Sequence, residues 1–332
     1  MSFLANKPVD RVPIAFFHHV CDPEGYDKGT ESEFYFEQNV EGNCRIRDRF
    51  EPDLVKVMND SLFTPPFDLS FVKESKDLRK IEPLPENHPY NLKSMELTKR
   101  IREFYGDEVP LYATVFSPLY VFRVLMATGG MPGLGGNEAR FLQFMGEDPE
   151  SCAYALNVIS EGIISLDNRM MKESGADGIY LSVNNWNGTL KNEVYRQYVT
   201  PSEKAVLDAA NAIRPMNILH ICGFYGMTND LSLFRDYDAA VYNWNVHAES
   251  VGLKEGKKYF GGRPVLGGFA QSPDGVIYCG TKEEVKAETK RILYESGQTG
   301  IMLGADCTVP QDIDEHRFEW VREAATEFAA GI

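Results

Sequence analysis

The chain has 332 residues, of which 43% are hydrophobic and 25% charged, enough for a sizeable core in one large domain spanning residues 1–332. Its formal net charge of -15 argues against nucleic-acid-binding and anionic-membrane-binding proteins, which need a basic face. The 6 cysteines are scattered, no apolar run reaches the roughly 18 residues of a membrane span, and the opening residues do not resemble a signal peptide. We therefore expect a cytoplasmic protein with reduced thiols and with no nucleic-acid or membrane partner.

Short apolar runs recur along the chain, separated by amphipathic stretches. In chain order, the runs predicted to be strands are 12–18, 54–60, 110–117, 178–183, 217–222, 239–245, 264–270 and 300–307. Such runs favour parallel strands covered on both faces. Between them, 149–174 has helical spacing, and 281–297 opens with a Thr281–Glu284 capping box. Strands alternating with helices in this way predict an α/β fold, a (β/α)8 TIM barrel in a single domain. The glycine cluster 128–136 lacks the Lys-Ser/Thr pair of a phosphate loop and is interpreted as a loop or lid between helices.

The carboxyl ends of the predicted strands are rich in polar residues. In barrels of this kind the catalytic groups gather at these ends. They carry His18, His19, Asp60, Ser117, Asn184, Asn185, His220, Cys222, Asn243, Asn245, Gln271, Asp306 and Cys307. Because adjacent strand residues point to opposite faces, only one of His18 and His19 can enter the barrel mouth.

The most informative pattern is His220-Ile-Cys222, followed by Cys307 at the end of the last predicted strand. Residues i and i+2 of a strand share a face, so His220 and Cys222 can face one centre, and a cysteine from another strand end can close it. One imidazole and two thiolates form a good zinc set with a position left open for a substrate. The alternative interpretation is a buried core histidine and two buried cysteines.

The whole chain resembles the uroporphyrinogen decarboxylase superfamily. The segments that carry the resemblance are LHICG (219–223), YNWNVH (242–247), PVLGGFAQSPDGVIYCGTKEEVKAE (264–288) and GIMLGADCTVP (300–310). The resemblance implies a distorted (β/α)8 barrel. It also implies one of two activities: cofactor-free decarboxylation of uroporphyrinogen, or zinc-dependent methyl transfer from a methylated corrinoid protein to a thiol.

Two differences from the decarboxylase branch favour the methyltransferase branch. The decarboxylases have an N-terminal motif with two arginines for substrate carboxylates, whereas this chain reads FFHHVCDPEGY at 16–26. The methyltransferase branch is marked by H-x-C and a later cysteine, which match His220, Cys222 and Cys307. That branch also tends to have a glutamate near the end of strand six, where this chain has asparagines, so His247 or Glu249 is a candidate fourth ligand.

The resemblance therefore implies zinc at His220, Cys222 and Cys307, a partner corrinoid protein, and a small-molecule thiol or similar methyl acceptor. Asp60 resembles the central aspartate of the decarboxylases and is expected to orient the substrate or a nearby proton. The other candidates for catalytic contacts are His18, His19 and His247, and those for cofactor contacts are Asn184, Trp186, Asn243 and Asn245. The alternatives are a decarboxylase of a related carboxylate and a non-catalytic corrinoid or metal binder. A homodimer is expected from the same resemblance.

Overall fold

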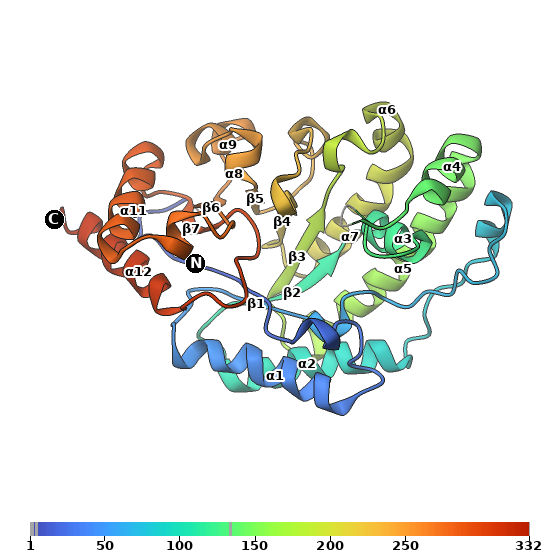
Figure 1. Ribbon diagram of the computed structural model, residues 1–332, viewed down its shortest axis with the longest axis horizontal. Coiled ribbons are helices and arrows are strands. Elements are labelled where there is room, and N and C mark those ends of the chain that lie inside the picture. Colours follow the sequence, from blue (N-terminus) through green and yellow to red (C-terminus); the bar gives the residue numbers. More distant parts are fainter. Residues whose placement is uncertain (1–2, 4–5, 133–134, 332) are drawn as a thin grey trace.

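The computed structural model describes residues 3, 6–132 and 135–331, and within them seven strands form one parallel sheet (Figure 1). The strands are β1 (Val55–Val57), β2 (Leu111–Phe116), β3 (Gly178–Val183), β4 (Ile218–Ile221), β5 (Val241–Trp244), β6 (Val265–Phe269) and β7 (Ile301–Ala305). Each strand pairs with the next in chain order. The sheet curls and carries its helices on the outside, which gives an α/β, barrel-like architecture (Figure 1).

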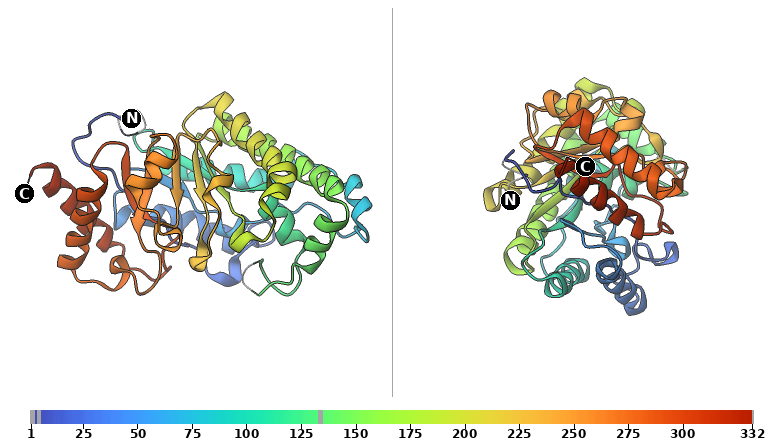
Figure 2. Two further views of the ribbon diagram at one scale, coloured as in Figure 1. Left: turned by 90° about the horizontal axis from the view of Figure 1, so that it is seen from above. Right: turned by 90° about the vertical axis from the view of Figure 1, so that its left-hand side faces the viewer.

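The helices follow the strands along the chain. They are α1 (Glu33–Arg45), α2 (Pro89–Tyr105), α3 (Pro118–Met126), α4 (Ala139–Glu147), α5 (Pro149–Glu173), α6 (Asn192–Val194), α7 (Thr200–Ile213), α8 (Val246–Glu249), α9 (Leu253–Tyr259), α10 (Val276–Cys279), α11 (Lys282–Ser296) and α12 (His316–Ala329). Helices α11 and α12 pack side by side at the end of the molecule that carries the C-terminus (Figure 2). In the described part of the chain, no helix combines the length and the apolar character of a membrane span.

The predicted first strand, 12–18, is not a regular strand, so the expected set of eight is reduced to seven in the described residues. This segment makes only isolated parallel bridges, Ile14 to Leu303 and His18 to Val309. On its other side, Ile14 donates its N–H to the Asp53 carboxylate at 2.8 Å rather than to a strand carbonyl. Asp53 also donates its backbone N–H to the Ile14 carbonyl at 3.1 Å, so this side of the segment is held by one backbone and one side-chain hydrogen bond and no regular ladder continues into β1.

Local sequence signals account for the positions at which the two helices predicted in detail begin. Helix α5 begins after Asp148, whose side chain accepts the N–H of Ser151 at 3.1 Å. Helix α11 has the predicted capping box: Glu284 donates its N–H to Thr281 Oγ1 at 3.2 Å, and Thr281 donates its own to Glu284 Oε2 at 2.7 Å. The glycine cluster connects α3 to α4, with Thr128 and Asn137 bridged at its ends, although residues 133–134 lie outside the described part.

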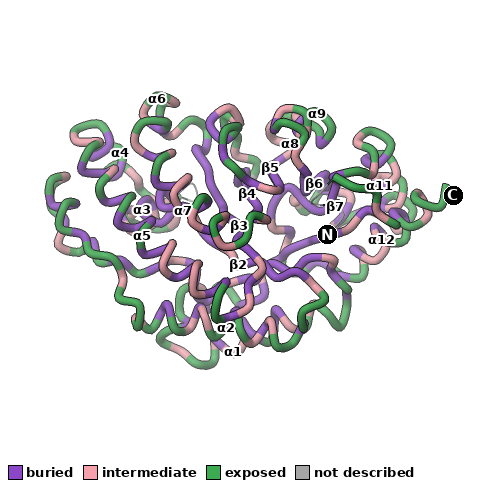
Figure 3. Tube along the Cα trace, turned by 180° about the vertical axis from the view of Figure 1, so that it is seen from behind, coloured by how far each residue is buried: buried purple, intermediate pink, exposed green. Residues whose placement is uncertain are grey.

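The strands are almost wholly buried, and Figure 3 shows a largely purple trace at the centre of the molecule. Val55 and Val57 of β1 belong to the large apolar cluster shared with the helices, whereas Met58 belongs to a smaller cluster with Tyr112 and Tyr180. This alternation places one set of strand side chains inside the curl of the sheet. The candidate site lies above that inner cluster.

Candidate metal centre and cavity

The three predicted metal ligands lie together. His220 is on β4, Cys222 directly follows that strand, and Cys307 follows β7. Their ligand atoms are all within 4.8 Å of one another; Cys307 Sγ is 4.0 Å from Cys222 Sγ and 3.4 Å from His220 Nε2. All three side chains are buried. Strands β4 and β7 are separated by two others in the sheet, so the curl of the sheet brings the ligands together.

Asn243 on β5 determines which ring nitrogen of His220 faces the cysteines. The Nδ2 group of Asn243 donates to the carbonyls of Leu266 at 2.9 Å and Ala305 at 3.3 Å, so its Oδ1 is the acceptor. That oxygen accepts the Tyr180 hydroxyl at 2.6 Å and His220 Nδ1–H at 2.5 Å. His220 therefore carries a proton on Nδ1, and its Nε2 is turned toward the cysteine sulfurs.

The pKa values of the two cysteines are shifted in opposite directions. The hydrogen bond with Cys222, with support from His220 and Lys56, lowers the pKa of Cys307 well below its ordinary value. The same hydrogen bond and burial raise the pKa of Cys222 well above its ordinary value. Two cysteine sulfurs and one imidazole nitrogen thus converge at one point, a donor set that suits a soft divalent cation.

A cavity of about 360 Å³ opens beside this cluster. Its walls are largely aromatic: Tyr26, Phe63, Phe116, Tyr120, Trp186 and Phe224. The described lining includes the ammonium of Lys56 and the amide of Asn184, and it includes no Asp or Glu. The site can therefore accept a small ligand with an apolar body next to the cysteines.

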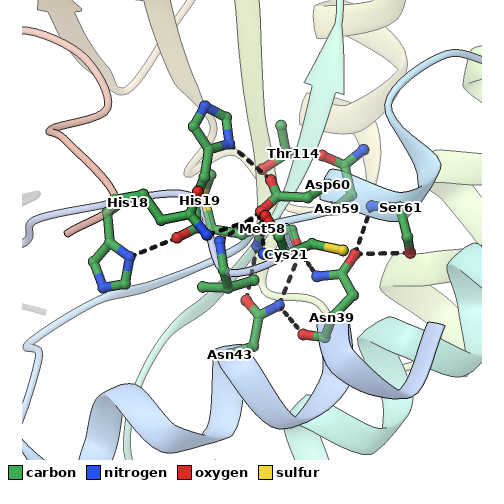
Figure 4. A network of polar contacts seen from close by, with 12 residues as sticks. His18, His19, Cys21, Asn39, Asn43, Met58, Asn59, Asp60, Ser61 and Thr114 are labelled. Atoms are coloured by element: carbon green, nitrogen blue, oxygen red, sulfur yellow. Dashed lines mark hydrogen bonds and ion pairs between the residues drawn. The ribbon is translucent and has the colours of Figure 1, made fainter. Parts of the chain in front are cut away.

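Asp60 lies behind the cavity wall and holds His19 (Figure 4). Its Oδ2 accepts the N–H groups of Val20 at 2.6 Å and Cys21 at 3.0 Å, and its Oδ1 is 3.0 Å from His19 Nδ1. Asp60 is fully buried and is absent from the cavity lining, whereas His19 is part of it. The geometry makes Asp60 a group that positions His19 and the chain at 19–21, with no direct contact to the cavity.

His18 points away from the cavity. Its Nδ1 is 2.7 Å from the carbonyl of His19, and its Nε2 is 3.2 Å from Glu315 Oε1. Of the two adjacent histidines, His19 faces the cavity, and His18 connects the segment 12–18 to the chain that leads into α12.

His247 and Asp306 form a pair at a second cavity of about 660 Å³, which His19 also lines. Asp306 Oδ2 accepts from His247 Nδ1 at 2.6 Å and from its backbone N–H at 3.0 Å, and the hydrogen bond raises the pKa of His247. Burial raises the pKa of Asp306 despite this bond. Within the described residues, neither His247 nor Glu249 belongs to the group of side chains whose ligand atoms lie close enough together to hold a metal ion. No fourth protein ligand is therefore seen there.

The four predicted cofactor contacts lie at three different places. Asn184 and Trp186 line the cavity beside the cysteines, and Trp186 donates Nε1–H to the Cys222 carbonyl at 2.8 Å. Asn243 is fully buried beneath His220. Asn245 lines the second cavity, donates to the Gly223 carbonyl at 2.7 Å and caps α8. Asn243 thus has a supporting place under the metal centre, away from a ligand surface.

Lys56 on β1 is the lining residue that the sequence interpretation missed. It is only 9% exposed and lines the same cavity as His220, Cys222 and Cys307. The signal was a lysine at the centre of an apolar strand run, Leu54-Val-Lys-Val-Met58. A charged residue in a strand covered on both faces is unusual enough to indicate a site.

The sequence matches the uroporphyrinogen decarboxylase (URO-D) family over residues 37–328. It is similar to methylcobamide:CoM methyltransferase MtbA of Methanosarcina acetivorans, with 26% identity over 223 residues that cover 67% of this chain and 60% of that protein. It is equally similar to uroporphyrinogen decarboxylase of Chlorobium luteolum, with 26% identity over 247 residues, 73% of this chain and 65% of that protein. The matched part therefore spans less than two thirds of either relative.

Two solved structures share the fold. A methyltransferase from Methanosarcina mazei has a TM-score of 0.76 at 19% identity, covering 98% of this chain and 97% of that one. A B12-independent methionine synthase from Shewanella sp. W3-18-1 has a TM-score of 0.59 at 12% identity, covering 97% and 98%. These likenesses support the barrel-like architecture, and the match over residues 37–328 shows that the chain belongs to the URO-D family.

Proposed function

We propose that this protein is a zinc-dependent methyltransferase that moves a methyl group from a methylated corrinoid protein to a small thiol. The observation that carries the proposal is the convergence of His220 Nε2, Cys222 Sγ and Cys307 Sγ within 4.8 Å. The methyltransferases among the relatives and the solved structures support it. The same proposal treats residues 1–332 as one barrel domain in which the segment 12–18 fills the eighth position.

The donor set fits zinc. Two sulfurs and one imidazole are the usual ligands of a zinc site that keeps a position open, and the Asn243 contact holds the imidazole in the ligating tautomer. Zinc bound there would deprotonate a substrate thiol and present it as a nucleophile near neutral pH. The cavity beside the cysteines gives that thiol a largely apolar surrounding.

The surrounding residues then bind and orient the reactants. Trp186 and Asn184 offer a flat ring and an amide on the cavity wall, and Asn245 and His247 offer polar groups in the neighbouring cavity. His19, held by Asp60, faces both cavities and can donate or accept a hydrogen bond between them. We propose that the corrinoid approaches over these two cavities, since both are formed by residues at the carboxyl ends of the strands.

Decarboxylation of uroporphyrinogen is the competing function, because decarboxylases are also among the relatives. Its substrate bears eight carboxylates, which need several cationic partners. The described lining of the cavity next to the cysteines contains Lys56 and no arginine. The buried Arg123 is already paired with Glu138 at 2.6 Å. The charges of the site therefore favour methyl transfer.

Metal content tests the proposal. Elemental mass spectrometry of the purified chain is expected to give about one zinc per chain, and Cys307→Ala is expected to lose it, because a three-ligand site does not survive the loss of a thiolate. Cys279→Ala is the control, since Cys279 is exposed and outside the cluster. Full zinc occupancy in Cys307→Ala, or no zinc in the unmodified chain after loading under reducing conditions, would contradict the assignment. A zinc-loaded chain is then assayed with a methylated corrinoid and a panel of thiols.

A further inference from the structure

Glu203 on α7 carries a fully buried carboxyl group that the proposed reaction does not use. Its Oε2 accepts two hydrogen bonds, one from the hydroxyl of Tyr195 at 2.8 Å and one from the hydroxyl of Tyr237 at 2.7 Å. Its Oε1 has no hydrogen-bond partner in the part of the chain that the structure describes. Glu203 therefore holds two tyrosines from different parts of the chain through a single oxygen atom.

The two tyrosines connect Glu203 to the wall of the cavity beside the cysteines. Tyr195 begins a π-helical turn, Tyr195–Val199, between α6 and α7, and such turns are rare and frequent at functional sites. Its hydroxyl also lies 3.5 Å from the backbone carbonyl of Asn184, which lines that cavity. Tyr237 is buried in the chain that leads into β5. The carboxyl group of Glu203 thus lies directly behind the cavity wall.

The surroundings of Glu203 are polar but uncharged. The groups that act on it are the hydroxyls of Tyr237, Tyr195 and Ser117, and burial keeps both tyrosines neutral by raising their pKa well above its ordinary value. Arg123 acts on Tyr195 electrostatically but is already paired with a carboxylate. A buried carboxylate without a cation is costly. Burial accordingly raises the pKa of Glu203 to about 7, although the tyrosine hydrogen bonds oppose this shift.

We propose that Glu203 is a buried proton-binding site that controls the packing of this part of the cavity wall. The neutral carboxyl group keeps Tyr195 and Tyr237 in place, and its ionisation favours local opening of the segment Tyr195–Val199, where water can solvate the carboxylate. In the open form the group has the ordinary pKa of a glutamate, near 4.5. The closed form therefore binds the proton more tightly, and the ratio of closed to open forms falls about tenfold per pH unit between these two pKa values. Above about pH 7 both forms are ionised, and the ratio levels off.

Amide hydrogen exchange of the full chain at pH 5.5 and 7.5, corrected for the intrinsic effect of pH on exchange, tests this site without metal or ligand. In the unmodified chain, the protection of Tyr195–Val199 is expected to fall about 10- to 30-fold between the two pH values. Glu203→Gln cannot ionise, so its protection is expected to change by less than about twofold. Glu150→Gln is the control, since Glu150 accepts the hydroxyl of Tyr198 in the same segment at 3.1 Å but is exposed.

Tyr237→Phe provides a second, independent test. It removes a donor that stabilises the ionised carboxylate, so the pKa of Glu203 rises and the fall in protection is expected to continue to a higher pH than in the unmodified chain. An equal fall in the unmodified chain and in Glu203→Gln would overturn the proposal. If Glu203→Gln does not fold, an unchanged pH profile in Tyr237→Phe would overturn it instead. Neither result depends on zinc or on methyl transfer, so this proposal and the proposed function fail separately.

Discussion

At the scale of single residues, the candidate site depends on side chains that lie outside the cavity lining. Asn243 on β5 holds the imidazole of His220 by a 2.5 Å contact. Asp60 holds the imidazole of His19 in a similar way, by a 3.0 Å contact between its Oδ1 and His19 Nδ1. The sequence shows these residues as polar groups at strand ends, but it does not show whether each one faces the cavity or supports a neighbour.

Asn243→Leu is expected to weaken zinc binding by about 10- to 100-fold, because the orientation of His220 is no longer held. Competition for zinc against a chelator measures this change. Asn157→Ala, an exposed position on α5, serves as the control. Unchanged zinc affinity in Asn243→Leu would mean that His220 is oriented by its packing alone.

Asp167 on α5 is fully buried, and burial raises its pKa well above its ordinary value. Above about pH 4 the unfolded chain ionises this group while the folded chain keeps it protonated, so the free energy of unfolding falls as the pH rises toward the folded-state pKa. Asp167→Asn is expected to raise the free energy of unfolding at pH 7 by about 1–3 kcal/mol, with a smaller gain near pH 4. Urea unfolding at the two pH values measures it, with the exposed Asp208→Asn as control. An equal gain at both pH values would rule out the ionisation as its cause.

At the scale of elements, the contact between Arg123 and Glu138 connects the cavity wall to the chain between α3 and α4. Arg123 on α3 is 1% exposed, donates to both Glu138 oxygens at 2.6 and 3.0 Å, and donates to Asn184 at 2.8 Å. Met131, in the same connection, lines the cavity. The pair therefore holds this connection, which the glycine pattern predicted only as a loop.

Glu138→Gln is expected to lower the free energy of unfolding by about 3 kcal/mol, because it leaves the buried guanidinium without its counter-charge. Urea unfolding is the measurement, and Glu147→Gln at the exposed end of α4 is the control. If both variants unfold at the same urea concentration, the ion pair contributes no net stability and the connection is held by its apolar contacts.

At the scale of the whole molecule, the N-terminal segment joins the two edges of the sheet. Ala15 and Pro13 exchange hydrogen bonds with Leu303 of β7 at 2.8 and 2.9 Å, while Asp53, just before β1, accepts from Ile14. Asp53 also accepts two hydrogen bonds from Arg11 at 2.6 and 2.8 Å. The Asp53 carboxylate therefore supplies part of the hydrogen bonding that a strand ladder supplies elsewhere in the sheet.

Asp53→Ala is expected to lower the free energy of unfolding by about 1–2 kcal/mol and to speed amide hydrogen exchange at Ala15 and Leu303, because the segment loses its side-chain contacts on the β1 side and keeps only one backbone hydrogen bond there. Exchange is followed by NMR or mass spectrometry, with the exposed Asp10→Ala as control. Unchanged exchange at both amides would show that the contacts with β7 are sufficient.

The sequence by itself determined the alternation of strands and helices from 54–60 onward, the parallel sheet, the capped helices and the grouping of His220 with Cys222. These features follow from local periodicity and from residues a few positions apart. The sequence also predicted that Cys307 joins this pair, and the structure places its sulfur 4.0 Å from that of Cys222. The tertiary structure alone decided that 12–18 is not a regular strand and that His19 and not His18 faces the cavity. It also decided that Asn243 supports His220 and that Lys56 faces the ligand space. These outcomes depend on strand register and on the curl of the sheet, which bring together residues far apart in the chain.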